Sequence, residues 1–120
     1  IYGNGGNDTL WGGDGGDYLQ GDAGGDVLRP QAGYDYLSGG AGADSFLFDT
    51  TGFQQDAIFD FTVGSDKLVI HQSVFSSFAA LQANTTQVGA NTFINAGFGD
   101  VIVLVNFNAA TLTAGDVVLF

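Results

Sequence analysis

The strictest feature of the chain is a nine-residue repeat that runs through its first 47 positions. Aspartate returns at every ninth position, at Asp8, Asp17, Asp26, Asp35 and Asp44. Glycine keeps the same step from Gly6 to Gly42, and a large apolar residue keeps it from Leu10 to Phe46. Three residue types held to one period over five consecutive copies define an internal repeat, so the fold must itself be repetitive.

Each unit reads G-G-x-G-x-D-x-L-x, a six-residue glycine-rich turn followed by a three-residue strand. The middle residue of each strand is apolar and is expected to point inward, because side chains alternate along a strand. One unit is too short to close a coil, so two units make one turn of it. Leu10, Leu28 and Phe46 should then stack on one face, and Leu19 and Leu37 on the other. In the fourth unit Pro30 and Gln31 replace two glycines, and we expect its turn to persist with altered local geometry.

Charge excludes several classes of partner. The net charge is −11, from 13 aspartates, no glutamate, and only Arg29 and Lys67 as cationic side chains. Without a basic patch, binding to nucleic acid or to an anionic membrane is not expected. Cysteine is absent and no run of 18 apolar residues occurs, so we expect neither disulfides nor a membrane-inserted helix.

The repeat resembles the RTX (repeats-in-toxin) nonapeptide, which builds calcium-bound parallel β-rolls in secreted bacterial proteins. The segment 56–70 is similar to the D-x-I-x-D-F-x-x-G-x-D-x-I sequence that follows such repeats in serralysin-type proteases and alginate epimerase modules. The ending 112–120 resembles the ending of many RTX proteins, a region that carries the uncleaved type I secretion signal. A last core strand is the alternative interpretation of this apolar ending.

The resemblance implies an all-β fold, a parallel β-roll over residues 1–47 followed by a β-rich cap over 48–120, together forming one continuous module. Within the cap we expect a short helix at 77–82 and strands at 91–95, 101–107 and 117–120. The chain opens with Ile1-Tyr2, which fit the last two positions of a preceding unit. It lacks a cleavable N-terminal signal, and we interpret it as the C-terminal part of a longer protein.

Calcium takes six to eight oxygen ligands, which stacked glycine-rich turns with aspartate can supply. RTX ligands come from positions two, four and six of one repeat and one, three and six of the repeat two units later. Carried onto this chain, the resemblance implies about three complete sites, with the following ligands: Asn4, Gly6 and Asp8 with Gly21, Ala23 and Asp26; Gly13, Gly15 and Asp17 with Pro30, Ala32 and Asp35; and Asp22, Gly24 and Asp26 with Gly39, Ala41 and Asp44. Partial sites are expected at both ends of the array. At its C-terminal end, Asp44 could meet Asp60 or Asp66 of the following segment.

Two functional hypotheses follow, and a catalytic one finds little support. His71 is the only histidine, and no nucleophile–base pair is recognisable. The first hypothesis is a non-catalytic, extracellular calcium module that folds on calcium binding and supports type I secretion and the stability of an upstream domain; its partners are calcium ions and the secretion machinery. The second is a carbohydrate-binding or surface-attachment module for polysaccharide. Its aromatic side chains, which could instead be ordinary exposed strand residues, are Trp11, Tyr18, Tyr34 and Tyr36.

Overall fold

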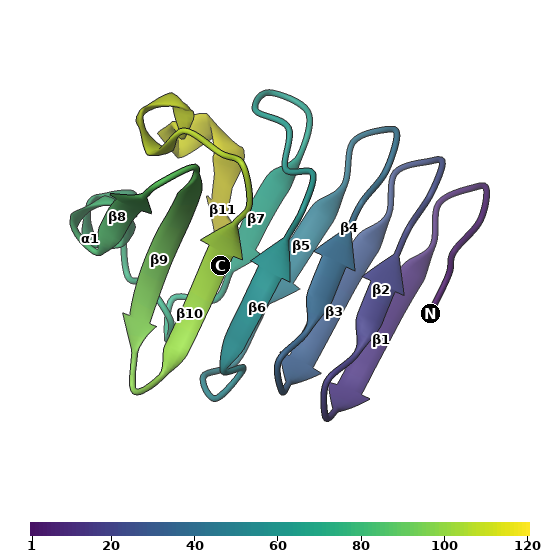
Figure 1. Ribbon diagram of the computed structural model, residues 1–120, viewed down its shortest axis with the longest axis horizontal. Helices are drawn as coiled ribbons and strands as arrows, with labels where there is room; N and C mark the ends of the chain where they lie inside the picture. The colour runs from purple at the N-terminus through teal and green to yellow at the C-terminus, as the bar shows by residue number, and fades with distance from the viewer.

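The computed structural model describes residues 1–120 as two β-sheets that form the opposite walls of a roll (Figure 1). The first sheet contains, in order, β1 (Thr9–Asp14), β3 (Val27–Ala32), β5 (Ser45–Phe48), β7 (Lys67–Ile70) and β11 (Val117–Leu119). The second contains β2 (Tyr18–Gln20), β4 (Tyr36–Ser38), β6 (Gln55–Ile58), β10 (Asp100–Leu104), β9 (Asn91–Gly97) and β8 (Thr85–Val88). Successive strands from β1 to β7 alternate between the sheets, and their pairing is parallel, which confirms the predicted all-β roll.

The apolar residue of each repeat faces the interior and stacks on its equivalent two units away. Leu10 pairs with Leu28, and Leu28 with Phe46, along the first sheet. Leu19 pairs with Leu37 along the second sheet. All five are buried, so the predicted division of these residues between two faces is confirmed. Since side chains alternate along a strand, one inward residue per unit is enough to build this wall of the core.

Three of the five predicted three-residue strands are longer than expected, because β5 has four residues and both β1 and β3 have six. β2 and β4 have three residues, but β1 and β3 have six, because their pairing continues into the following turn as Gly13↔Gln31 and Asp14↔Ala32. A parallel ladder continues wherever two backbones stay in register, and the repeat brings turns into register as well as strands.

The turns share one backbone conformation in all five units. The second and fourth positions of every unit have positive φ, at Asn4, Gly6, Gly13, Gly15, Asp22, Gly24, Gln31, Gly33, Gly40 and Gly42. The fourth unit therefore keeps its turn, as predicted, and Gln31 adopts a φ of 70° that glycine would adopt without strain. The fourth position also requires close approach, because a side chain at Gly24 would overlap the Gly6 carbonyl.

Both sheets continue beyond the recognisable repeats. β6 pairs in parallel with β4, and β7 pairs in parallel with β5. After the helix α1 (Phe78–Ala83), which is capped by Ser77, β10 extends the second sheet beside β6, and β11 extends the first beside β7. The division at residue 47 thus marks the end of the sequence repeat, while the parallel pairing runs on to the last strand.

The sequence predicted α1 and the three strands β9, β10 and β11, although β10 ends at Leu104 rather than at 107. It predicted no strand at β6 or β7, and it also missed β8. That strand pairs antiparallel with β9 at the edge of the second sheet, opposite the N-terminal end of the roll in Figure 1. Its sequence, Thr-Thr-Gln-Val, carries no apolar alternation, and three of its four residues are exposed. It forms a local hairpin with β9, in which Val88 lies opposite Asn91 across the turn Gly89–Ala90, and this pairing rather than apolar alternation defines it.

One apolar cluster of 18 buried residues runs through the interior of both halves. Short 3₁₀ turns, η1 (Ala109–Thr111) and η2 (Ala114–Asp116), lead the chain back to β11. None of the helices has the length and hydropathy needed to cross a membrane.

Candidate metal centres

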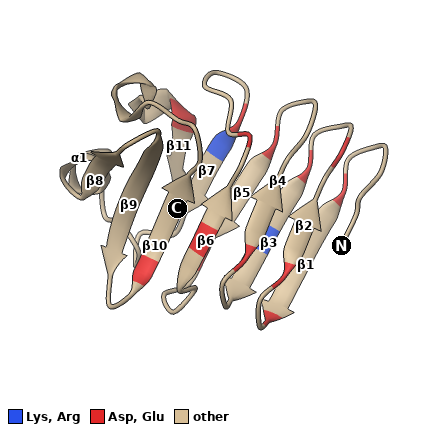
Figure 2. Ribbon diagram, in the orientation of Figure 1, with Lys and Arg blue, Asp and Glu red and all other residues tan.

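The aspartates of the repeats form two ladders along the rims of the roll, where Figure 2 shows acidic residues gathered near the ends of the strands. In each case the backbone N–H of one aspartate donates to Oδ1 of the aspartate two units later. The distances are 2.8 Å for Asp8 to Asp26, 2.9 Å for Asp26 to Asp44 and 2.7 Å for Asp17 to Asp35. The hydrogen bonds of the carboxylates therefore link unit n to unit n+2, as the sequence predicts.

Both ladders continue past the repeats. Asp35 N–H donates to Asp56, and Asp44 N–H donates to Asp66, each at 3.0 Å. Asp66 is thus the neighbour of Asp44 in the ladder. Asp60, the other residue considered from the sequence, lies outside the ladders and instead accepts hydrogen bonds from the Gly39 and Gly40 amides and the Ser38 hydroxyl.

The second carboxylate oxygen is the distinctive feature of these aspartates. Six buried Oδ2 atoms accept no hydrogen bond, those of Asp8, Asp17, Asp26, Asp35, Asp44 and Asp56. Leaving one buried polar atom unsatisfied costs about 1–3 kcal/mol, and more when the group is charged. Six such atoms cost more than about 6 kcal/mol, a large part of the roughly 5–15 kcal/mol that stabilises a typical domain. These oxygens therefore require a partner that no protein donor supplies.

Backbone carbonyls lie beside these oxygens. A Cβ built on Gly3 would lie 2.7 Å from the Gly21 carbonyl oxygen and 2.8 Å from Asp8 Oδ2, so both oxygens flank one glycine. The Pro30 carbonyl and Asp17 Oδ2 flank Gly12 in the same way, and the Gly39 carbonyl and Asp26 Oδ2 flank Gly21. Acceptors grouped together without a donor suit a cation. These three carbonyl–carboxylate pairs are among those that the sequence assigned to the three sites.

The other assigned carbonyls also lie between stacked turns, where several already accept a backbone hydrogen bond. Asn4 accepts from Ala23 N–H, Asp22 from Ala41 N–H, and Ala41 from Gly24 N–H. The carbonyls of Gly6, Gly15 and Gly24 press against the glycines at position four two units later, and Gly13 and Ala32 belong to the paired strands β1 and β3. A carbonyl oxygen has two lone pairs, so each of these oxygens retains one for a cation.

The chemistry of the donors favours calcium. No three His, Cys, Asp or Glu side chains gather at one point, so the donors are carboxylate pairs combined with carbonyls. Calcium accepts such all-oxygen, flexible sets, whereas magnesium demands strict octahedral geometry and keeps its waters. The residues present fit calcium, and the complete ligand sets remain proposals.

Burial makes several of these carboxylates costly to ionise without a cation. Desolvation raises the pKa of Asp44 to about 6 and that of Asp56 to about 8, and the negative charges of neighbouring aspartates add to both shifts. Desolvation likewise raises the pKa values of Asp35 and Asp66. A divalent cation would remove the cause, because it replaces lost hydration and cancels the repulsion between carboxylates.

The last ladder aspartates are Asp56 and Asp66. Beyond them, two further aspartates accept hydrogen bonds from protein donors with both of their oxygens. Asp100 accepts from the Gly52 and Gln54 amides at 2.7 and 2.9 Å. Asp116 accepts from Gly64 N–H and from the amide and hydroxyl of Thr113. Burial opposes ionisation of Asp116, but these hydrogen bonds and the charge of Lys67 outweigh it and lower its pKa.

The remaining candidate features have structural roles. His71 Nδ1 contacts the Ser73 hydroxyl at 2.9 Å and accepts Ser73 N–H, and its ring packs edge-on against Phe120.

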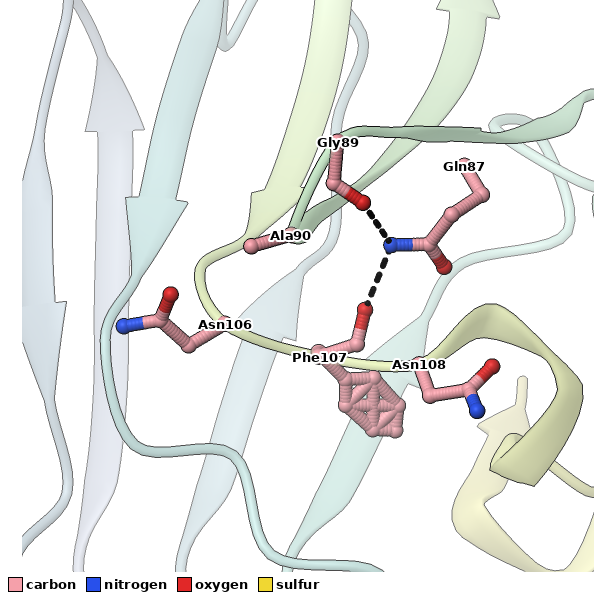
Figure 3. Close-up of a pocket in the computed structure, with 6 residues that line it drawn as sticks. All are labelled: Gln87, Gly89, Ala90, Asn106, Phe107 and Asn108. Atoms are coloured by element: carbon pink, nitrogen blue, oxygen red, sulfur yellow. Dashed lines mark hydrogen bonds between the residues drawn. The ribbon is translucent and has the colours of Figure 1, made fainter.

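An open pocket of about 450 Å³ lies between the β8–β9 turn and the loop after β10 (Figure 3). There the Gln87 amide donates to the carbonyls of Gly89 and Phe107, which fastens the hairpin to the loop. The residues that line the pocket are Gln87, Gly89, Ala90, Asn106, Phe107 and Asn108, with no carboxylate, imidazole or hydroxyl side chain among them.

Fold and site together define a parallel β-roll with aspartate ladders and candidate calcium centres between its turns. Residues 1–29 and 31–49 match the family described as RTX calcium-binding nonapeptide repeat, in four copies. The chain therefore carries an RTX calcium-binding repeat array. No curated protein matches the chain by sequence.

Three solved structures share the fold over nearly the whole chain. The AlgE6R2 subunit of the Azotobacter vinelandii mannuronan C5-epimerase is 29% identical with a TM-score of 0.65, covering 98% of this chain and 88% of that one. The AlgE6R3 subunit of the same enzyme is 28% identical with a TM-score of 0.59, covering 94% and 78%. The extracellular lipase LipA from Serratia marcescens is 26% identical with a TM-score of 0.68; the match covers 93% of this chain but only 21% of the lipase.

Proposed function

We propose that this chain is a non-catalytic calcium module that folds outside the cell when calcium binds. The observation that carries the proposal is the set of six buried Oδ2 atoms without a hydrogen-bond donor. Without a cation their combined cost, more than about 6 kcal/mol, can exceed the net stability of a small domain. Metal binding to sites that exist only in the folded state contributes directly to folding free energy.

This coupling makes the folding of the module depend on the calcium concentration around it. Calcium sites of extracellular modules typically bind in the range of about 10⁻⁴–10⁻³ M, so the chain would stay unfolded where calcium is scarce and fold where it is plentiful. Such behaviour suits type I export, in which an unfolded chain passes through the machinery, and the folded roll then stabilises an upstream domain. The likeness to part of an extracellular lipase supports this role.

Circular dichroism of the purified chain tests the proposal. In excess chelator the β signal of the repeat half should be lost, and millimolar calcium should restore it. An equal concentration of magnesium should not, because magnesium demands strict octahedral geometry and gives up its waters reluctantly, whereas calcium accepts flexible sets of oxygen ligands. Identical spectra in chelator and in calcium would refute calcium-dependent folding.

A second candidate function, carbohydrate binding, rests on an aromatic row on the outer face of the second sheet. Tyr18 and Tyr36 have ring centroids 6.5 Å apart, and Tyr36 stacks on Phe59 at 5.8 Å. All three rings are about half exposed. The structural likeness to subunits of a mannuronan C5-epimerase gives this surface a context. With few cationic side chains nearby, a neutral glycan fits it better than a polyanion.

The row differs from the set of aromatics considered from the sequence. Trp11 lies on the other sheet, where the Arg29 guanidinium packs 4.5 Å from its ring centroid, and Tyr34 belongs to the turn before β4. Calorimetric titration with neutral and anionic oligosaccharides would test the surface. Tyr36→Ala should abolish binding, while Tyr34→Ala, which removes an exposed tyrosine outside the row, should not. Equal effects of the two variants would exclude the row as the binding surface.

A further inference from the structure

We propose that residues 51–56 are a hidden repeat turn and form, with the turn at 30–35, a fourth complete calcium site that the nonapeptide motif does not contain. The inference rests on the proposed calcium function and concerns a segment beyond the matched repeats, which end at residue 49. Asp56 lies 12 residues after Asp44, three more than the period, so the spacing conceals the equivalence.

Residues 51–56 have the same pattern of positive φ values as a repeat turn. Gly52 and Gln54 have φ of 85° and 65°, and they lie four and two residues before Asp56. In every nonapeptide unit the residues four and two positions before the aspartate also have positive φ. Gln54 holds the place of the glycine at position four, a substitution that removes the turn from the sequence pattern but not from the fold.

The turn also stacks on the fourth unit as the repeats stack on one another. Asp35 N–H donates to Asp56 Oδ1 at 3.0 Å, the same bond that links the aspartates within the array. Ala57 N–H donates to the Asp35 carbonyl at 2.9 Å, as Tyr36 N–H does to the Asp17 carbonyl. The carboxylate ladder and the strand pairing therefore both continue from the fourth unit, at Asp35, to Asp56 and Ala57.

Two unpartnered carboxylate oxygens mark the place of the ligand. Asp35 and Asp56 are 1% and 0% exposed, and Oδ2 of each accepts no hydrogen bond. Neither Arg29 nor Lys67 forms a hydrogen bond or ion pair with them; Arg29 pairs with Asp49, and the Lys67 ammonium donates to the Gly115 carbonyl. Two buried carboxylates in a hydrogen-bonded ladder, flanked by turns rich in carbonyls, match the chemistry of a calcium ion.

The far side of the same turn is closed by protein. Asp100, 4% exposed, accepts the amides of Gly52 and Gln54 with its two oxygens. The Asp100 carboxylate accepts the hydrogen bonds of the two amides that have positive φ. No further metal site follows on this rim, so the last one is the junction of 30–35 and 51–56. Both oxygens of Asp100 have protein donors, so this carboxylate does not need a metal ion.

Native mass spectrometry of the calcium-saturated chain tests the site. Asp56→Asn keeps the shape and the Oδ1 acceptor and should reduce the number of bound calcium ions by one. Asp14→Asn, which makes the same charge change at an exposed carboxylate of a repeat turn, should leave the number unchanged. An unchanged count in Asp56→Asn would overturn the fourth site, while the other sites would remain.

A measurement on the wild-type chain covers the case in which the Asp56 variant does not fold. Anomalous diffraction from crystals grown in calcium should show a peak between the carboxylates of Asp35 and Asp56. Peaks at the nonapeptide sites with none at this junction would refute the inference alone. No calcium peak anywhere in the roll would refute the proposed function as well.

Discussion

Asp26 should be more sensitive than Asp17, because it belongs to two of the three sites that the nonapeptide resemblance implies and Asp17 belongs to one. Its Oδ1 accepts Asp8 N–H at 2.8 Å, and its own N–H donates to Asp44 at 2.9 Å. It is 1% exposed, and its Oδ2 has no donor. Asp17 occupies the same position in its unit, but its side chain accepts no hydrogen bond from an earlier unit, and it contributes to one complete site only.

The losses of calcium-binding free energy in Asp26→Asn and Asp17→Asn can be compared. Asparagine retains an oxygen for the ladder hydrogen bond and removes the charge. An interaction with a charged group contributes about 1.5–3 kcal/mol, so losing it at two sites costs about 3–6 kcal/mol and at one site about half as much. The difference of about 1.5–3 kcal/mol corresponds to about a 10- to 150-fold larger loss of total calcium affinity for Asp26→Asn.

Isothermal titration calorimetry with calcium measures this difference, and the calcium midpoint of folding by circular dichroism gives an independent value. Asp14→Asn serves as the control, because its exposed carboxylate is outside the ladders and its loss should leave both values nearly unchanged. If Asp26→Asn and Asp17→Asn weaken binding equally, the pairing of unit n with unit n+2 does not determine the sites, and the reasoning fails.

Three further predictions concern the backbone, the last strand and pH. Gln31→Gly should raise the melting temperature in calcium by about 3–5 °C, since it relieves about 1 kcal/mol of left-handed strain at a φ of 70°; a lower melting temperature would show that the side chain has a role of its own. Deleting 117–120 removes β11 from the edge of β7 and should lower thermal stability, promote aggregation seen by light scattering, and abolish type I export of the full-length parent; undiminished export would leave only the structural role. In chelator, raised pKa values mean that the folded state binds protons more tightly than the unfolded state. The β signal of the metal-free chain, measured by circular dichroism, should therefore be greatest below about pH 4 and fall as pH rises through about 6 for Asp44 and about 8 for Asp56; a signal that rises over that range would contradict the burial of these carboxylates.

The extent of sequence-based prediction differed between the two halves. In the repeats, the period placed the inward residues, the stacking of unit n on unit n+2, and the aspartates at the rims. Beyond residue 47, local patterns recovered α1, β9, β10 and β11, whose apolar or capping residues are recognisable. The strands β6, β7 and β8 and the turn at 51–56 were missed. Parallel pairing with β4 and β5 creates β6 and β7, and the polar strand β8 exists through its hairpin pairing with β9.

The candidate sites show the same limit. Spacing assigned Asp26 to two sites but could not choose between Asp60 and Asp66 as the neighbour of Asp44. The neighbour of Asp44 is the carboxylate that the chain fold brings next to it on the rim. Asp66 precedes β7 and so comes into register with Asp44, whereas Asp60 follows β6 and meets the amides of Gly39 and Gly40. The aromatic row was also hidden, since Phe59 joins the two tyrosines only through the pairing of β4 with β6.

The sequence by itself determined the repeating coil, since a nine-residue period with one inward apolar residue and positive-φ turns admits few closed backbones. It also determined the oxygen-rich chemistry, because aspartate recurs where each turn meets its strand. Only the tertiary structure decided which carboxylates bind the amides of the last turns on each rim. Asp100 and Asp116 come from segments far along the chain, and pairing of β10 with β6 and of β11 with β7 brings them to amides that local spacing cannot foresee.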